Sequence, residues 1–252
     1  MRRTPLAITV LAGLAIGGAV AATGASAASA VPAKVEVVTV LPNPPFALRK
    51  KGKLTGFDVQ LANAVANAAG ISALQWRMAQ DLSTAISAVT LGQVPMAASS
   101  LTITPTRQKQ MIFSTPYMNA NLAVVTAQGK RVGPGGNLSN LTVGAVKGST
   151  SATYLRSLPG NVVEVLFPDI TSAYQALLRG SIKAVVNDYA QADWYVQHNN
   201  GMFDLPAIIN QPGKIAFAFT KDQTALRNTI NRGLAIVKQN GTLARLKNQW
   251  MP

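Results

Sequence analysis

Residues 92–107 read GQVPMAASSLTITPTR, and this stretch gives the clearest local signs of the chain's architecture. Gly92 ends a helical pattern, an apolar run follows it, and the run stops at the polar pair Ser99-Ser100. Thr104-Pro105 then supplies an N-cap followed by proline at the first helical position, so a helix begins there and displays Arg107 in its first turn. The stretch therefore predicts a strand with polar side chains at its carboxyl end and a basic residue nearby.

A second stretch, GSIKAVVND at residues 180–188, repeats this order. Asn187 follows Gly180 by seven positions, just as Ser99 follows Gly92. In open α/β sheets, ligands bind beyond the carboxyl ends of the strands. Two such units suggest two lobes that face one cleft. Any α/β protein repeats the order helix, glycine and strand. The equal spacing alone is therefore as consistent with coincidence as with two related lobes.

Short β-like runs alternate with amphipathic helical patterns along the rest of the chain, which predicts an α/β protein with mainly parallel sheets. A glycine-rich loop at 129–136 (GKRVGPGG) is predicted to mark the boundary region between the lobes. The expected strands cover residues 35–41, 143–146, 162–166 and 182–186. Helices are expected from Phe57 and from Thr150, two more are expected to be capped by Ser83 and Thr171, and one or two cover residues 226–250.

The first thirty residues have the order of a secretory signal peptide. Arg2-Arg3 precedes an apolar run at 6–22, and small-residue cleavage signals end at Ala27 and Ala30. The alternative is an uncleaved membrane anchor, but the run is short for a span and rich in Ala and Gly. Residues 1–30 are therefore expected to be removed after export to the periplasm.

Composition excludes several other functions. The 252-residue chain carries a formal net charge of +14, yet its basic residues are scattered, and the cluster Arg49-Lys50-Lys51 has no aromatic residues interleaved with it. Nucleic-acid binding is therefore not expected. With no cysteine and a single histidine, His198, the chain offers no nucleophile–histidine pair, metal cluster or disulfide, and no cofactor is expected. The nine acids show no spacing typical of glycosidase carboxylates.

Several short motifs follow one another in a fixed order between residues 35 and 250. They are Pro44-Pro45-Phe46, Gly56-Phe57-Asp58-Val59, the run from Ser99 to Arg107, Phe113 to Tyr117, Val143 to Thr150, Asn187-Asp188, Asn240-Gly241-Thr242-Leu243 and Trp250. Together they resemble the amino-acid-binding class of bacterial extracellular solute-binding proteins, family 3.

The resemblance implies a two-lobed periplasmic-binding-protein fold of type II, with a ligand cleft between the lobes. A hinge of two crossing segments is expected near 120–124 and 213–218. Lobe 1 then consists of residues 31–120 and 218–252, and lobe 2 of residues 121–217. The implied function is capture of a small amino-acid-like ligand by a monomer, which delivers it to an ABC permease in the inner membrane.

The same resemblance implies how the cleft holds an amino acid. Arg107 grips the carboxylate, because a guanidinium fork matches its two oxygens. Thr150, at a helix start, adds donors to the same carboxylate. Asp188 pairs with the ammonium, and Ser100 and Thr102 accept hydrogen bonds from it. Plainer alternatives are a solvated surface arginine and ordinary cap or turn residues. The complete predicted set is Arg107, Ser99, Ser100, Thr102, Ser149, Thr150, Asp188, Asn43 and Leu82.

Three positions depart from the family pattern. Asn43 stands where many members carry an aromatic ring that stacks on the ligand, and Leu82 stands at the facing wall, which is often aromatic. Val40 occupies a position where binders of cationic amino acids place an acid. A polar or modestly aliphatic amino acid, or a related small molecule, is therefore expected rather than lysine or arginine.

Two other functions are compatible with this fold. A ligand-sensing periplasmic protein that docks to a signalling receptor has the same sequence features. Cyclohexadienyl dehydratases also use these two lobes, with acid and base groups in the cleft. The sparse acids and Asn43 argue against such an enzyme, so no catalytic activity is expected.

Overall fold

The computed structural model describes residues 32–251, and the predicted signal peptide lies outside the described residues. Lobe 1 is built on a five-stranded sheet of order β4-β1-β5-β14-β6, in which β1 is parallel to β4 and β5 while β14 is antiparallel to β5 and β6. Its strands are β1 (Lys34–Val40), β4 (Ala73–Ala79), β5 (Met96–Ala97), β6 (Ile112–Phe113) and β14 (Ala218–Phe219), and its helices are α1 (Phe57–Ala68), α2 (Leu82–Thr90), α3 (Pro105–Gln108), α7 (Thr224–Gln239) and α8 (Thr242–Trp250).

Lobe 2 has its own five-stranded sheet with the order β10-β9-β11-β8-β12. Again the first three strands are parallel, and β8 lies antiparallel to both of its neighbours, β11 and β12. Its strands are β8 (Leu122–Ala127), β9 (Thr142–Val146), β10 (Val163–Phe167), β11 (Ala184–Asp188) and β12 (Phe203–Ile209); its helices are α4 (Thr150–Ser157), α5 (Ile170–Leu178) and α6 (Tyr189–His198). The two sheets thus share one plan, and both are mixed rather than parallel throughout.

The two repeated sequence stretches occupy equivalent places in the two lobes. Gly92 and Gly180 follow α2 and α5 with φ of 70° and 74°, the left-handed region in which glycine ends a helix without strain. The predicted caps of these helices, Ser83 and Thr171, are wrong. Asp81 caps α2 and Asp169 caps α5, and each carboxylate accepts a hydrogen bond from the backbone N–H three residues later. An N-cap side chain must reach the free N–H groups of the first helical turn, and in both helices the aspartate occupies the position from which it does so.

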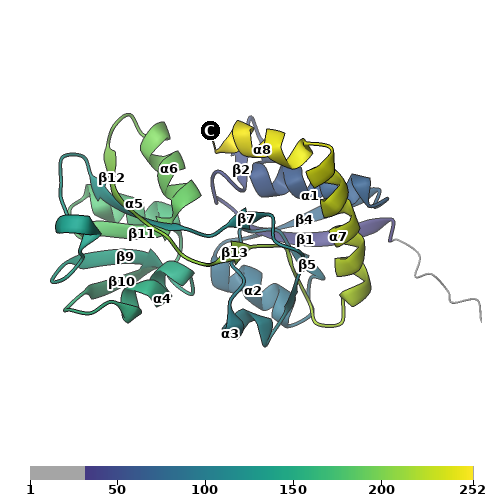
Figure 1. Ribbon diagram of the computed structural model, residues 1–252, viewed down its shortest axis with the longest axis horizontal. Coiled ribbons are helices and arrows are strands. Elements are labelled where there is room, and N and C mark those ends of the chain that lie inside the picture. The colour runs from purple at the N-terminus through teal and green to yellow at the C-terminus, as the bar shows by residue number, and fades with distance from the viewer. Residues whose placement is uncertain (1–31, 252) are drawn as a thin grey trace, which may run out of the picture. The chain divides into compact units, whose positions relative to one another are not determined.

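Two chain segments connect the lobes. β7 (Met118–Asn119) pairs antiparallel with β13 (Lys214–Ile215), and the Ala120 N–H donates to the Gly213 carbonyl at 3.0 Å. Figure 1 shows these segments between the lobe 2 sheet on the left and the lobe 1 sheet on the right. The loop at 129–136, predicted to mark the lobe boundary, instead connects β8 to β9 within lobe 2. Its glycines form a tight 3-10 turn, which the sequence does not distinguish from a linker.

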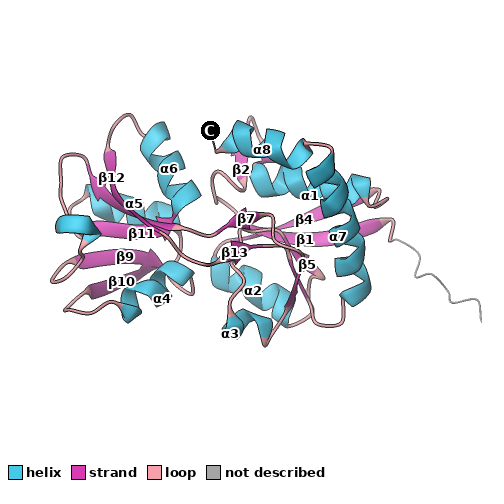
Figure 2. Cartoon of the chain, in the orientation of Figure 1, coloured by secondary structure: helices cyan, strands magenta, loops and turns pink. Residues whose placement is uncertain are grey.

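Successive apolar side chains of the central strands pack on opposite faces of each sheet, and helices cover both faces. Val37 packs into the cluster that includes α1 and α7, whereas its neighbour Val38 packs into the cluster that includes α2. In lobe 2, Val185 packs with α5 and Val186 with α4. Successive side chains of a strand point to opposite faces, so a sheet covered on both sides requires continuous apolar strands. Figure 2 shows α1 and α2 on opposite sides of the lobe 1 sheet.

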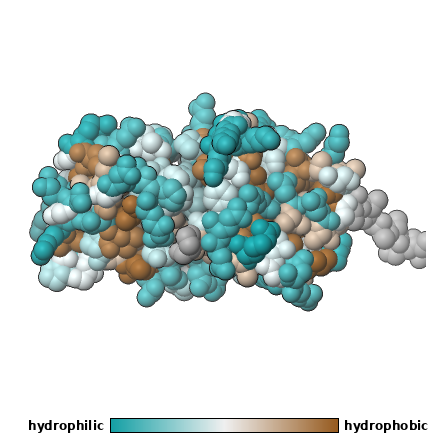
Figure 3. Space-filling model, turned by 90° about the horizontal axis from the view of Figure 1, so that it is seen from above, coloured by the Kyte–Doolittle hydropathy of each residue, from teal (hydrophilic) through white to brown (hydrophobic). Residues whose placement is uncertain are grey.

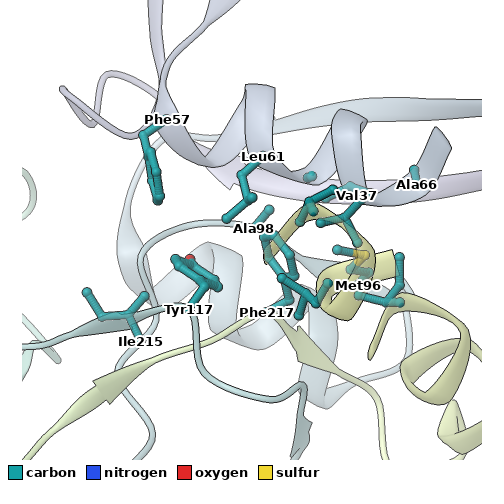
Figure 4. Close-up of a cluster of buried hydrophobic side chains, with 14 of the residues drawn as sticks. Val37, Phe57, Leu61, Ala66, Met96, Ala98, Tyr117, Ile215 and Phe217 are labelled. Atoms are coloured by element: carbon teal, nitrogen blue, oxygen red, sulfur yellow. The ribbon is translucent and has the colours of Figure 1, made fainter. Parts of the chain in front are cut away.

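An aromatic cluster fills the part of the lobe 1 core nearest the hinge. The rings of Phe57 and Tyr117 lie 5.9 Å apart, and those of Tyr117 and Phe217 lie 4.9 Å apart. All three side chains are buried, and Figure 4 shows them between α1 and the crossing segments. Tyr117 directly precedes β7 and Phe217 follows β13, so the cluster anchors both crossing segments to the first helix.

Gly233 lets α7 approach α1 closely. A Cβ built at this position would lie 2.2 Å from the Val65 carbonyl oxygen, a backbone atom that cannot move without displacing α1. We expect Gly233→Ala to lower the free energy of unfolding by about 3 kcal/mol, since overpacking a close helix contact forces the backbones apart. Urea denaturation measures this. The control is Ala235→Gly on the exposed side of α7, which should cost about 1 kcal/mol.

The surface outside the cleft is mostly polar, as Figure 3 shows for one face, where hydrophobic patches are scattered among hydrophilic residues. The basic cluster Arg49-Lys50-Lys51 lies in the hairpin of β2 (Leu48–Lys50) and β3 (Lys53–Thr55), where all three residues are exposed. Within residues 32–251, no helix has the length and apolar character that a bilayer crossing needs.

Candidate ligand-binding cleft

The carboxyl ends of the parallel strands of both lobes meet around one cleft. Lobe 1 contributes the segments after β1 and β5 and the start of α2, and lobe 2 contributes the ends of β9 and β11 and the starts of α4 and α5. Hydrogen bonds join the two lobes across the cleft, which contains a cavity of about 60 Å³. All nine residues of the predicted set line it, namely Asn43, Leu82, Ser99, Ser100, Thr102, Arg107, Ser149, Thr150 and Asp188.

Arg107 is held at the cleft by the local sequence around it. Thr104 caps α3 by accepting the Arg107 N–H at 3.2 Å, which fixes the backbone from which the side chain projects. The guanidinium donates to the Thr102 carbonyl at 2.9 Å and, across the cleft, to the Gly148 carbonyl at 3.2 Å. The residue is 8 % exposed. Burial lowers the pKa of Arg107 and the charge of Asp188 opposes this, so the guanidinium stays cationic at neutral pH.

Asp188 supplies the opposite charge. It is the last residue of β11, immediately before α6, and its side chain does not cap that helix. Burial raises the pKa of the Asp188 carboxyl to about 6, while the Arg107 charge acts in the opposite direction. One carboxylate oxygen, Oδ1, is buried and has no hydrogen-bond partner among residues 32–251. A buried carboxylate oxygen without a donor is costly, and an ammonium group placed beside it would offset that cost.

In the segment after β5, some polar groups are already hydrogen-bonded within the protein and others remain available to a ligand. The Ser99 hydroxyl accepts the Val40 N–H at 3.0 Å, so it is already used to join the segment to β1. Ser100 has φ of 47°, uncommon for a residue other than glycine, and this turn aims the segment at the cleft. The Thr102 carbonyl accepts from Arg107 and keeps a second lone pair.

Asp58, which was not in the predicted set, holds this turn in place. Its Oδ2 accepts the Ser100 N–H at 2.5 Å, and its Oδ1 accepts the Tyr117 hydroxyl at 2.9 Å. The residue is 0 % exposed, and burial raises the pKa of Asp58 to about 7 against the effect of these two hydrogen bonds. Asp58 belongs to the motif Gly56-Phe57-Asp58-Val59, one of those that carry the family resemblance. Nothing in the local sequence indicates that this residue of the first helix contacts a loop forty-two positions later.

On the lobe 2 side, the start of α4 faces the cleft. Ser149 is its N-cap, with a hydroxyl that accepts the Ala152 N–H at 3.1 Å, and Thr150 is the first helical residue. The backbone N–H groups of a first helical turn have no partners within the helix and favour an anion. Arg107 and the α4 start thus lie on opposite sides of the same part of the cleft, linked by the hydrogen bond to Gly148.

Asn43 and Leu82 line another part of the cleft, on lobe 1. Asn43 donates to the Ser100 hydroxyl at 3.3 Å, and its side-chain oxygen accepts a hydrogen bond from Gln191 of α6. Gln191 is buried and was not in the predicted set. A glutamine in a helix carries no sequence signal for such a role, because its partner lies 148 positions away.

Among the described residues that line the cleft, three are charged: the cation Arg107 and the acids Asp188 and Asp169. Asp169 is already committed, since its two oxygens accept from the Ser172 N–H at 2.9 Å and from the Ser172 hydroxyl at 2.7 Å. The remaining pair has one positive and one negative group. Within residues 32–251, no group of three His, Cys, Asp or Glu side chains is placed to hold a metal ion.

Comparisons with known proteins identify the family of this chain. The model of the bacterial extracellular solute-binding proteins, family 3, matches residues 35–252. The chain is 27 % identical to the ABC transporter arginine-binding protein 1 of Escherichia coli strain K12, covering 91 % of this chain and 93 % of that one. It is 31 % identical to a probable histidine-binding protein of Neisseria gonorrhoeae, covering 94 % and 89 %.

Solved structures agree with the sequence comparison. The structure of an ancestral arginine-binding protein bound to arginine superimposes with a TM-score of 0.81 at 30 % identity, covering 87 % of this chain and 99 % of that one. The predicted two-lobed α/β fold and the predicted solute-binding role are thereby confirmed. The chain belongs to the bacterial extracellular solute-binding proteins, family 3.

Proposed function

We propose that this solute-binding protein captures a small neutral α-amino acid between its lobes. The observation that carries the proposal is the pair Arg107 and Asp188, one buried cation and one acid with a buried oxygen that lacks a donor among the described residues. An α-amino acid presents a carboxylate and an ammonium at a fixed separation. The cleft offers one group of each sign to receive them.

The carboxylate would lie between the Arg107 guanidinium and the start of α4. Arg107 presents a planar fork of donors, and Thr150 adds a helix N-terminus and a hydroxyl. The ammonium would donate to Asp188 Oδ1 and to the spare lone pair of the Thr102 carbonyl. The Ser100 hydroxyl accepts from Asn43 and keeps a second lone pair, which can accept from the ammonium as well.

The ligand side chain would meet neutral groups. The acid Asp169 is occupied as a helix cap, and the apolar Val40 and Leu82 line the lobe 1 wall. The named relatives bind arginine or are assigned to histidine. A buried cationic side chain needs an acid as its partner. Beside Asp188, the described lining offers only Asp169, which two hydrogen bonds from Ser172 hold as the cap of α5, so we infer a neutral ligand.

Family membership supports a role in delivering the captured ligand to an ABC permease, and we infer that the protein does this as an exported monomer in the periplasm. The two lobes would open and close about the β7 and β13 segments, with lobe 1 formed by residues 31–120 and 218–252 and lobe 2 by residues 121–217. The ligand would favour the closed form because it contacts both lobes. We assign no catalytic step. Asp58 is sealed by Ser100 and Tyr117, and Asp188 faces Arg107.

A thermal-shift screen of the purified protein against the twenty amino acids tests the proposal. A ligand at about 100 times its Kd stabilises by roughly 2.7 kcal/mol, which raises the Tm of a domain of this size by roughly 5–10 °C. We expect that shift with small neutral amino acids such as alanine, serine or threonine. A larger shift with arginine, lysine or histidine would contradict the neutral class, and no shift with any amino acid would contradict the amino-acid assignment.

A further inference from the structure

The lobes contact each other directly at a second place, away from Arg107. The side-chain amide of Gln191, on α6 of lobe 2, donates a hydrogen bond to the side-chain oxygen Oδ1 of Asn43 on lobe 1. The two residues are 6 % and 8 % exposed, so the bond is shielded from water. We propose that Gln191 and Asn43 form a neutral latch that holds the lobes closed and limits the size of the ligand side chain. This inference rests on the proposed function for its second part only.

Asn43 is a rigid half of the latch. Its carbonyl accepts the N–H groups of Phe46 and Ala47, both at 2.9 Å, and its own N–H donates to the Ala47 carbonyl at 2.7 Å. Prolines flank it at 42 and 44, and each fixes its own φ. The side chain is fixed as well, because its nitrogen donates to the Ser100 hydroxyl. A side chain held in this way loses little entropy when it accepts a bond from the other lobe.

On lobe 2, Gln191 is positioned by the backbone of α6. It lies in the first turn of α6, and the first residue of that helix donates its N–H to the Asn121 carbonyl at 2.8 Å, beside the first crossing segment. Gln191 follows Asp188 by three positions, and both line the cleft. The latch therefore lies next to the proposed ammonium site, over the region where the ligand side chain would extend.

The latch explains two features of the cleft together. Asn43 stands where the family pattern has a ring that stacks on the ligand, and here that position is bonded to protein. The small cavity of about 60 Å³ has room for a few water molecules in this closed arrangement. A ligand with a large side chain would have to break the bond between Gln191 and Asn43, whereas a small one would fit beneath it. Both groups are uncharged amides, so the latch does not titrate.

Fluorescence energy transfer between the lobes tests the latch without any ligand. The chain has no cysteine, so Ser87→Cys on α2 and Gln175→Cys on α5, both at exposed positions, give a clean pair of labelling sites. In this background we compare Gln191→Ala and the volume-conserving Gln191→Met. Each should reduce the ratio of closed to open molecules about five- to tenfold, the value of one hydrogen bond. Asn43→Ala combined with Gln191→Ala should add little to either single change, because the two residues share one interaction.

Gln197→Ala is the matched control. Gln197 lies on the exposed side of the same helix and bonds to Asp193 within lobe 2 at 2.8 Å. It should leave the distance distribution unchanged. If both Gln191 variants match Gln197→Ala, the latch is overturned, and Gln191→Met decides the matter even if the alanine variant fails to fold.

Ligand preference tests the size limit. In Gln191→Ala, the affinity for leucine or phenylalanine relative to that for alanine or serine should rise at least about fivefold, the value of the hydrogen bond that no longer has to break. An unchanged preference would overturn the size limit. If the wild type binds no amino acid, the proposed function fails, while the distance measurement still decides whether the latch exists.

Discussion

Arg107→Ala is expected to bind the amino-acid ligand about 1,000-fold more weakly than the wild type. The guanidinium would make two charge-assisted hydrogen bonds to the carboxylate, each worth about 1.5–3 kcal/mol when buried. Its loss also leaves the charge of Asp188 without a counter-charge in the cleft. Isothermal titration calorimetry with the ligand found in the screen measures the change.

Two further variants separate the carboxylate role from a general loss of charge. Arg107→Lys keeps the cation but offers a point charge in place of a planar fork, and we expect it to bind more weakly than wild type but more tightly than the alanine variant. Arg156→Ala removes an exposed arginine of α4 that is paired with Glu164 at 3.0 Å. It should leave affinity unchanged. Affinity within tenfold of wild type for Arg107→Ala would exclude Arg107 as the carboxylate group.

The parts of the site that could be predicted from sequence are those set by local rules. Thr104-Pro105 fixes the start of α3, and so the direction of Arg107, within four residues. Ser149 fixes the start of α4 in the same way. The repeated spacing from glycine to strand end places Ser99 and Asn187 at equivalent sheet edges. Each depends on contacts between neighbours in the chain, which residue type and spacing encode.

The parts that could not be predicted depend on long-range contacts. Asp58 meets Ser100 and Tyr117 from the first helix, and Gln191 meets Asn43 from the other lobe. Such partners are brought together by sheet order and lobe closure, and neither leaves a trace in the local pattern. The loop at 129–136 failed for a related reason, since glycines make a tight turn and a flexible connection equally possible.

Asp188→Asn is expected to weaken binding about 100-fold or more at pH 8, because the ligand ammonium loses its only charged partner among the described lining residues while Arg107 keeps the carboxylate. The wild type should also bind less tightly below about pH 6, where the Asp188 carboxyl takes up a proton, since its pKa is about 6. Its affinity should fall by up to about tenfold per pH unit there. The asparagine variant should show no such dependence, which calorimetry between pH 4.5 and 8 checks.

The ligand-free stability of the same variant should move in the opposite direction. The pKa of Asp188 is raised from 3.8 to about 6 on folding, so between these values the native state binds more protons than the unfolded state. Stability contributed by this group is therefore present at low pH and is lost as the pH rises towards 6. Asparagine avoids that loss, and Asp58 titrates alike in both proteins, so its effect cancels in the comparison.

Urea denaturation should accordingly show Asp188→Asn to be more stable than the wild type by about 1–2 kcal/mol at pH 8, with the difference shrinking as the pH is lowered towards 4. A binding site often retains a charge that the fold alone would not favour, and the ligand then compensates for its burial. If the variant were instead less stable at pH 8 while binding normally, Asp188 would be a structural partner of Arg107, and the ammonium would have to be placed elsewhere in the cleft.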